Sequence, residues 1–304
     1  MRHTFSYLAI VVAVLATIGV ALTAGVDAMS FSPWSAPVNL QAAGADGELN
    51  TAALEGCPAI SKDGTNLYFA SNRTGGLGGI DIYVSTRSDA DDPWGAPVNL
   101  GAPVNTSADE LCPTPMRNGH GFMFVSSRPG GCGALDIYAT RRHAGHGWLP
   151  PVNLGCAVNS AADEASPFVV GDELYFSSTR TGDSDIYVAP IDDDGPAGAP
   201  VLVAELNTAS NDARPNVSRD GLEIFFDRPG ACGGIDLWMS TRPGREASWS
   251  QPANLGCGVN SAANDLRASL SWDGKQLYFG SNRSGSEGNQ DVYVTTREQV
   301  PAGQ

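Results

Sequence analysis

A long phrase recurs five times along this chain and limits its fold more than any other feature. The first copy runs from Ser61 to Arg87 and reads SKDGTNLYFASNRTGGLGGIDIYVSTR. Four degenerate copies follow, ending at Arg142, Pro190, Arg242 and Arg297. Self-similarity at a period of roughly fifty residues indicates a repeat architecture, in which each copy is one unit that packs on its neighbours.

Each copy is predicted to form two β-strands with their turns. Asp-Gly pairs beginning at Asp63, Asp220 and Asp273 suit a tight hairpin turn that needs a residue with positive φ. Apolar and aromatic runs such as LYF, FMF and IFF follow, and a glycine-rich loop then leads to a second run of the DIYVS type. No helical period competes with this pattern after residue 30, so the sequence predicts an all-β protein.

Two shorter phrases complete the unit. A Pro-Val-Asn-Leu segment, as in WGAPVNLG from Trp94, suits an edge strand, and a phrase such as VNTSADE precedes a further short strand. Four-stranded units repeated around an axis are propeller blades. The last copy lacks its Pro-Val-Asn-Leu segment, whereas an unattached one stands at Trp34 to Leu40. We therefore predict a single five-bladed β-propeller over residues 29–304, with four-stranded antiparallel blades and a ring closed by the N-terminal strand.

The recurring phrase resembles a known repeat. Its pattern S-x-D-G-x-x-L-Y-F-x-S-x-R-x-G-G-x-G-x-x-D-I-Y is similar to the WD40-like β-propeller repeat of the TolB type. The resemblance covers nearly all of the chain after residue 28, and it implies an exported bacterial propeller with an interaction or envelope-associated role. The chain differs from TolB in having five units and no recognisable separate N-terminal domain.

The N-terminal segment and the charge balance bear on location and partners. Arg2 and His3 precede an uncharged apolar run from Tyr7 to Ala24, so residues 1–28 are predicted to be a secretory signal peptide, with an uncleaved anchor as the alternative. The net charge of −15 disfavours binding to nucleic acid. We expect a secreted or periplasmic monomer with no membrane contact beyond this segment.

Six cysteines in an exported chain suggest disulfides. The second and fourth units each carry one cysteine in the glycine-rich loop and one after the outer strand. These two positions lie on the same face of a propeller. We therefore predict the pairs Cys132–Cys156 and Cys232–Cys257.

The other two cysteines, Cys57 and Cys112, occupy matching positions on the innermost strands of adjacent blades. We predict that they bridge blades 1 and 2 near the axis, with two free thiols as the alternative. No Cys-x-x-Cys spacing occurs, so the cysteines do not indicate a metal site.

An arginine and an aspartate flank the glycine-rich loop of every unit. A catalytic residue is rarely needed five times, whereas a guanidinium that binds a carboxylate across a hairpin neck serves every blade alike. We therefore expect structural ion pairs. They are Arg73–Asp81, Arg128–Asp136, Arg180–Asp185, Arg228–Asp236 and Arg283–Asp291.

One acidic residue enters each innermost strand, and ring closure is expected to gather these carboxylates around one mouth of the central channel. They are Glu55, Glu110, Glu164, Asp212 and Asp265. Two residues further on, and expected on the same strand face, stand Cys57, Cys112, Ser166, Arg214 and Arg267. Only the last two units place cations there, and such broken symmetry is typical of a site.

We predict that the five carboxylates, Arg214 and Arg267 bind a ligand. The alternative is that each carboxylate caps its Asn-Ser/Thr loop or pairs with an adjacent arginine.

These features favour a binding module for a protein or a glycan, which acts through the face carrying the carboxylates. An oxygen-rich ring also suits Ca²⁺, and no other cofactor is expected. The alternative is a glycan-active hydrolase or lyase that uses two of Glu55, Glu110, Glu164 and Asp212, with an arginine holding an anionic group. Five-bladed glycosidases such as the arabinanases share only the expected fold.

Histidines are few, and three of them fall in turns of blade 2 on the face opposite the carboxylates. They are His120, His143 and His146. Solvated loop histidines are the expected interpretation, and a surface zinc site is the alternative. No nucleophile elbow, phosphate-binding loop or Ser/His/Asp set is visible in the sequence.

Overall fold

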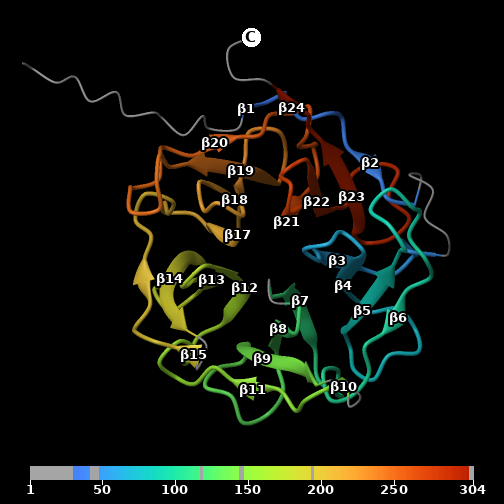
Figure 1. Cartoon of the computed structure of the whole chain (residues 1–304), viewed down its shortest axis with the longest axis vertical. Coiled ribbons are helices and arrows are strands. Elements are labelled where there is room, and N and C mark those ends of the chain that lie inside the picture. The colour runs from blue at the N-terminus through green and yellow to red at the C-terminus, as the bar shows by residue number, and fades with distance from the viewer. Residues whose placement is uncertain (1–29, 42–47, 117–118, 144–146, 193–194, 301–304) are drawn as a thin grey trace, which may run out of the picture.

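Five antiparallel sheets stand around a central axis, and their innermost strands face one another across the middle (Figure 1). The computed structural model describes residues 30–41, 48–116, 119–143, 147–192 and 195–300, and this part of the chain forms strands and no helix. No membrane-spanning helix is therefore found in the described ranges. The predicted five-bladed β-propeller is confirmed.

The first four blades follow the order of the chain from the axis outward. Blade 1 consists of β3 (Glu55–Ile60), β4 (Asn66–Ser71), β5 (Asp81–Thr86) and β6 (Val98–Asn99). Blade 2 consists of β7 (Glu110–Pro115), β8 (Gly121–Ser126), β9 (Asp136–His143) and β11 (Val152–Asn153), with β10 (Gly147–Trp148) beside the end of β9. Blade 3 consists of β12 (Glu164–Val170), β13 (Glu173–Ser178), β14 (Asp185–Asp192) and β16 (Val201–Leu202), with β15 (Gly195–Pro196) beside the end of β14. Blade 4 consists of β17 (Ala213–Val217), β18 (Glu223–Pro229), β19 (Ile235–Thr241) and β20 (Ala253–Asn254).

Blade 5 takes its outer strand from the other end of the chain, as predicted. It consists of β21 (Asp265–Leu270), β22 (Gln276–Ser281), β23 (Asp291–Thr296) and the N-terminal β2 (Val38–Asn39). The Asn50 side chain strengthens this closure, because it accepts a hydrogen bond from Val292 N and donates one to Val292 O. A further pair, β1 (Ser30–Phe31) with β24 (Gln299–Val300), joins the two ends (Figure 1). The predicted signal peptide lies outside the described residues.

The core lies between neighbouring blades. The second strand of each blade is buried on both faces, which explains its continuous apolar run: Leu67 and Phe69 in β4 are fully buried, as are Phe122 and Phe124 in β8. Side chains from adjacent blades meet, as where the rings of Tyr68 and Phe122 lie 5.1 Å apart. Burial of these large side chains stabilises each blade only when its neighbours are present.

All three predicted disulfides are present: Cys57–Cys112, Cys132–Cys156 and Cys232–Cys257. The first joins the innermost strands of blades 1 and 2, so the free-thiol alternative is excluded. The chain-entropy relation gives about 3.5 kcal/mol for each of the two short loops and about 4.2 kcal/mol for the long one. One disulfide therefore joins blade 1 to blade 2, and the other two each tie the glycine-rich loop of blade 2 or blade 4 to the segment after that blade's outer strand.

Candidate functional site: the central channel

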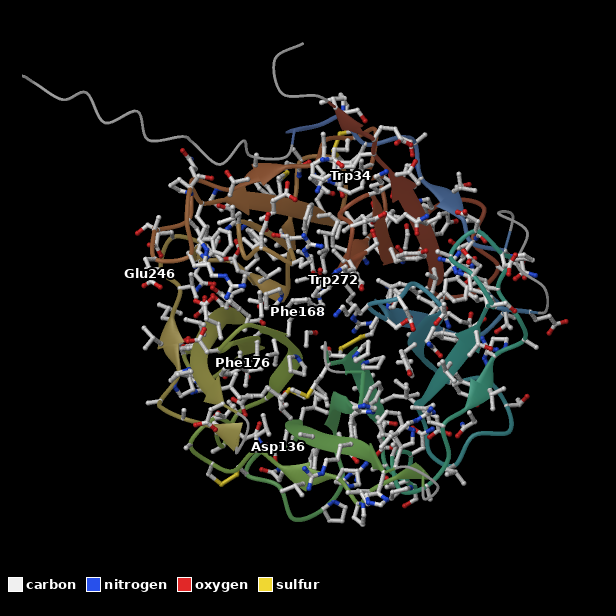
Figure 2. All side chains as sticks on the ribbon, viewed as in Figure 1. Trp34, Asp136, Phe168, Phe176, Glu246 and Trp272 are labelled. Atoms are coloured by element: carbon white, nitrogen blue, oxygen red, sulfur yellow. A yellow bond between two sulfur atoms is a disulfide. The ribbon has the colours of Figure 1, made fainter. Side chains whose placement is uncertain are left out.

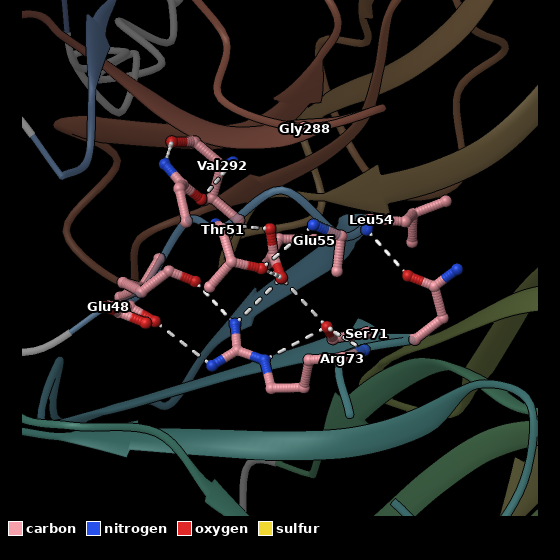
Figure 3. Close-up of polar contacts among 12 residues, drawn as sticks. Glu48, Thr51, Leu54, Glu55, Ser71, Arg73, Gly288 and Val292 are labelled. Atoms are coloured by element: carbon pink, nitrogen blue, oxygen red, sulfur yellow. Dashed lines mark hydrogen bonds and ion pairs between the residues drawn. The ribbon is translucent and has the colours of Figure 1, made fainter. Parts of the chain in front are cut away.

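The five carboxylates that begin the innermost strands are fully buried, with no exposed area. Glu55 accepts hydrogen bonds from Thr51 N at 2.9 Å, from Thr51 Oγ1 at 2.8 Å, from Ser71 Oγ at 3.0 Å and from Arg73 Nη2 at 3.0 Å (Figure 3). These bonds occupy both of its oxygens. The corresponding ion pairs in the other blades are Arg128–Glu110, Arg180–Glu164, Arg228–Asp212 and Arg283–Asp265. The structure thus shows the capping and arginine-pairing arrangement that the sequence left as the alternative.

The predicted pairing of these arginines with the aspartates beyond the glycine-rich loop is wrong. In blade 1, Arg73 reaches the buried carboxylate of Glu55 and not Asp81. Asp81 instead accepts hydrogen bonds from the backbone N–H groups of Leu77 and Gly78 and from the Asn99 side chain. The loop has no ladder partner for its N–H groups, so the aspartate satisfies them and holds the loop against the outer strand.

A β-bulge follows the carboxylate in every innermost strand and decides which side chains face the channel. The ladder shifts register between Gly56 and Ala59 in blade 1, and equivalent shifts occur in the other blades. The residue at the bulge has left-handed backbone geometry in all five strands, with φ of 50° at Cys57, 46° at Cys112, 51° at Ser166, 59° at Arg214 and 64° at Arg267. A bulge re-aims a side chain. Regular alternation therefore fails here, and the bulge residues line the channel while the carboxylates turn away from it.

The channel extends from the bulge residues toward the turns that follow the innermost strands, where Lys62, Arg219 and Trp272 lie. Trp272 and Phe168 flank the central opening in Figure 2. The hollow has a volume of about 80 Å³. It lies toward the face opposite the carboxylates, whereas the sequence predicts ligand binding at the carboxylate mouth.

The lining of the channel is cationic although the chain is acidic. Among the described residues that line it, four are basic and none is acidic. The basic residues are Lys62, Arg214, Arg219 and Arg267. They represent four of the 18 lysines and arginines in a chain of net charge −15. The channel therefore concentrates positive charge within an acidic protein.

Blades 4 and 5 carry a buried polar cluster beside the channel, which we call the Arg–Asp–Arg–Gln cluster: Arg214, Asp227, Arg267 and Gln290. Asp227 is fully buried and forms an ion pair with Arg214. Its Oδ1 also accepts a hydrogen bond from the backbone N–H of Arg267 at 3.2 Å. Arg267 Nη1 donates to Gln290 Oε1 at 3.2 Å. The cluster thus links the two blades beside the channel, which Arg214 and Arg267 line.

Burial shifts the pKa values of two members of the cluster. Burial, and secondarily the charge of Arg214, lower the pKa of Arg267 to about 9. Burial raises the pKa of Asp227 above its ordinary value, and the charge of Arg214 opposes that shift. Within the described residues, no partner for Arg267 Nε is found and no carboxylate pairs with its guanidinium. The charge of the neighbouring Asp227 opposes the lowering, so Arg267 carries a largely desolvated positive charge that is compensated in part but that no carboxylate meets in an ion pair.

Two glycines make room for this arrangement. A Cβ on Gly56 would lie 3.0 Å from Arg267 Nη1, and a Cβ on Gly280 would lie 2.8 Å from Gln290 Cδ. The positions that match Gly56 in the other blades hold Leu111, Ala165, Ala213 and Leu266. The space that Arg267 and Gln290 occupy thus exists because side chains are missing from both flanking strands.

The sequence predicts ligand-binding roles for Arg214 and Arg267 but does not single out Asp227, Gln290 or the residues at the rim of the channel. The rim residues are Lys62, Arg219 and Trp272. A comparison of the repeats could have revealed Asp227 and Gln290, because both differ in type from the residues at the matching positions of the other blades. The ladder positions that match Asp227 hold Ala70, Val125, Ser177 and Gly280. The positions that match Gln290, directly before the third strand, hold Ile80, Leu135, Ser184 and Ile235. A charged or amide side chain at a position otherwise small or apolar was the available signal.

The histidines do not form a metal centre within the described part of the chain. His120 and His143 lie with Arg142 and Trp148 in a shallow hollow between blades 1 and 2. His146 lies outside the described residues. No cluster of three or more His, Cys, Asp or Glu side chains suited to a metal ion occurs in the described ranges.

Comparison with known proteins shows the fold and no family. No protein-family model matches the sequence, and no curated protein matches it. The α-L-arabinofuranosidase from Lactobacillus brevis is 15% identical with a TM-score of 0.56, over 87% of this chain and 95% of that one. The putative TolB from Agrobacterium tumefaciens is 16% identical with a TM-score of 0.49, over 90% and 91%. TolB from Acinetobacter baumannii is 15% identical with a TM-score of 0.48, and the match covers 80% of this chain but 54% of that protein, about half its length.

Proposed function

We propose that this chain is a non-catalytic binding module whose ligand, a glycan or a segment of a protein, enters the central channel past Trp272. The observation that carries the proposal is the lining of the channel, which offers four basic side chains and no carboxylate among its described residues. Such a lining can hold a ligand by charge and aromatic contact. It does not supply the groups that acid–base catalysis on a glycan requires.

The burial of the carboxylates argues against the hydrolase alternative. Glycoside hydrolysis uses two carboxyl groups that flank the scissile bond, about 5 to 10 Å apart, and both must reach the substrate. Glu55, Glu110, Glu164 and Asp212 have no exposed area, and an arginine pairs with each. A Ca²⁺ ion at the same carboxylates would have to displace those arginines. The similarity to an arabinofuranosidase concerns the fold alone.

The three disulfides support an exported protein, because such bonds persist in oxidising compartments. Blades 1 and 2 are joined through the channel wall by one of them, so the geometry of the lining depends on it. We therefore propose that the protein acts outside the cytoplasm, in the periplasm or as a secreted monomer.

A channel-filling variant tests the proposal. Ser166→Trp places a bulky ring on the channel wall, whereas Ser210→Trp places the same ring on an exposed loop and serves as the matched control. Oligosaccharides and envelope proteins that bind the wild type should bind Ser210→Trp equally and lose binding to Ser166→Trp. Ligands that bind a folded Ser166→Trp as well as the wild type would show that the channel is not the site. Glycan turnover that disappears in a folded Glu110→Gln variant would establish the hydrolase instead.

A further inference from the structure

We infer that the channel contains a site for one carboxylate group, formed by Arg267 with Arg214 beside it, so that the ligand is an organic acid. The inference rests on the proposed function, because it names the chemical group by which the channel ligand is held.

Arg267 is the member of the cluster that remains available to a ligand. Asp227 neutralises Arg214, whereas Arg267 donates to the uncharged Gln290 and has no partner for its Nε among the described residues. A guanidinium binds a carboxylate through paired N–H···O bonds, and Arg267 lines the hollow with a guanidinium that forms no ion pair among the described residues. The local charge of the cluster is two arginines against one aspartate, so one negative charge completes it.

The cluster is expected to lower the stability of the fold, and other blades carry less polar side chains at the matching positions. A desolvated charge without a counter-ion destabilises a fold, and replacing it by packed apolar side chains is commonly neutral or favourable. Blades 1 and 2 contain that apolar alternative, with the Cys57–Cys112 disulfide where blades 4 and 5 have arginines. They also have Ala70 and Val125 where blade 4 has Asp227. Gly56 and Gly280 are needed to fit the arginine and the glutamine. Asp227, Gln290, Gly56 and Gly280 thus depart together from the repeat around one guanidinium that has no carboxylate in an ion pair.

The rim suits the entry of an anion. Lys62 Nζ lies 4.8 Å and the Arg219 guanidinium 5.6 Å from the centroid of the Trp272 ring, so two cations lie at the opening. Trp272 follows Arg267 by five positions along and just beyond β21, roughly 16 Å at the rise of a strand. Cations at the mouth of a narrow passage raise the local concentration of anions. A hollow of about 80 Å³ holds several water-sized groups and therefore fits a small acid or the acidic end of a larger ligand.

Paired probes that differ only in charge test the site. Titration calorimetry in chloride-free buffer compares acetate with acetamide and glucuronate with glucose, on the wild type, on Arg267→Gln and on the control Arg141→Gln, which removes the same charge from an exposed position of β9. We expect the acids to bind the wild type and Arg141→Gln, and the neutral partners to bind neither. Arg267→Gln should weaken acid binding about ten- to a hundredfold, the range of a hydrogen bond to a charged group.

The two probe pairs separate the sources of the carboxylate. Binding of glucuronate as well as acetate supports a sugar acid, and binding of acetate alone supports a smaller free acid. Equal binding of acids and neutral partners, or acid binding unchanged in Arg267→Gln, would overturn the inference. So would the absence of acid binding at the highest soluble concentration. A neutral ligand that binds the wild type but not Ser166→Trp would leave the binding module intact while the carboxylate site fails.

Discussion

The channel wall of blades 1 to 3 and that of blades 4 and 5 have the same backbone conformation but carry different side chains. All five strands bulge at the same place with a left-handed residue. In blades 1 to 3 the bulge side chains are a disulfide and Ser166, whose Oγ donates to Cys112 Sγ at 3.3 Å. In blades 4 and 5 they are two arginines within a buried polar cluster. Since the backbone conformation is common to every blade, it belongs to the architecture, and only the change of side chains points to function.

The arginines of the protein show the same contrast. Arg73 and its four counterparts each bind a buried carboxylate and lie against aromatic rings, as Arg73 does 5.2 Å from Phe69 and 5.0 Å from Tyr83. The Arg267 guanidinium has neither an ion pair with a carboxylate nor an aromatic ring among the described contacts. The five arginines that pair with buried carboxylates stabilise their blades, whereas Arg267, which has no such pair, lines the channel.

The largest expected effect belongs to the repeated ion pairs. Glu110→Gln leaves Arg128, largely buried, without its counter-ion, so we expect unfolding free energy to fall by about 3–5 kcal/mol, the usual cost of breaking a buried pair. Urea unfolding of the wild type and of Glu110→Gln, with the disulfides intact, measures this difference in unfolding free energy. A loss below about 1 kcal/mol would mean that the pair is not structural and would weaken the contrast with Arg267.

A smaller loss of unfolding free energy is expected for a substitution in the Arg–Asp–Arg–Gln cluster of blades 4 and 5. Asp227→Asn keeps the shape of the side chain but leaves Arg214 and Arg267 as two unneutralised cations, and we expect stability to fall by about 2–3 kcal/mol. Affinity for acetate should rise, because the same anion now meets two free cations. Unchanged stability together with unchanged acetate binding would show that Asp227 does not set the charge of the cluster.

The smallest expected effect is a gain of stability, and it belongs to the replacement of Arg267. Arg267→Met removes a desolvated charge, so we expect the variant to be more stable than the wild type at neutral pH by about 1–2 kcal/mol. The pKa of Arg267 is lowered to about 9 in the folded protein, so above that pH the unfolded chain binds more protons than the native one. Wild-type stability should then rise relative to the variant by up to about 1.4 kcal/mol per pH unit. Urea unfolding of both proteins on either side of this pKa tests it, and a constant difference would contradict the shift.

Repetition in the sequence determined the fold of this protein and its disulfides. Alternation of apolar runs with Asp-Gly turns and glycine-rich loops is local, so five copies predict five blades, and the unattached segment at Trp34 identifies the closing strand. Matching positions of cysteines predict the three disulfide pairs. These inferences need only the order of residues along the chain.

Tertiary structure decided where each side chain points and what it meets. The bulge before Ala59 turns Glu55 away from the channel and Cys57 into it, which regular alternation does not foresee. Arg73 pairs with Glu55 and not with the aspartate beyond the loop, although both carboxylates lie opposite Ser71 in the ladder, because the oxygens of Asp81 accept hydrogen bonds from loop N–H groups and from Asn99. Contacts between Arg267, Gln290 and Gly56 depend on the closing of blade 5 onto blade 1, which joins residues far apart in the chain. The local sequence pattern determines the number of blades, whereas the closed ring determines which charged side chains line the channel.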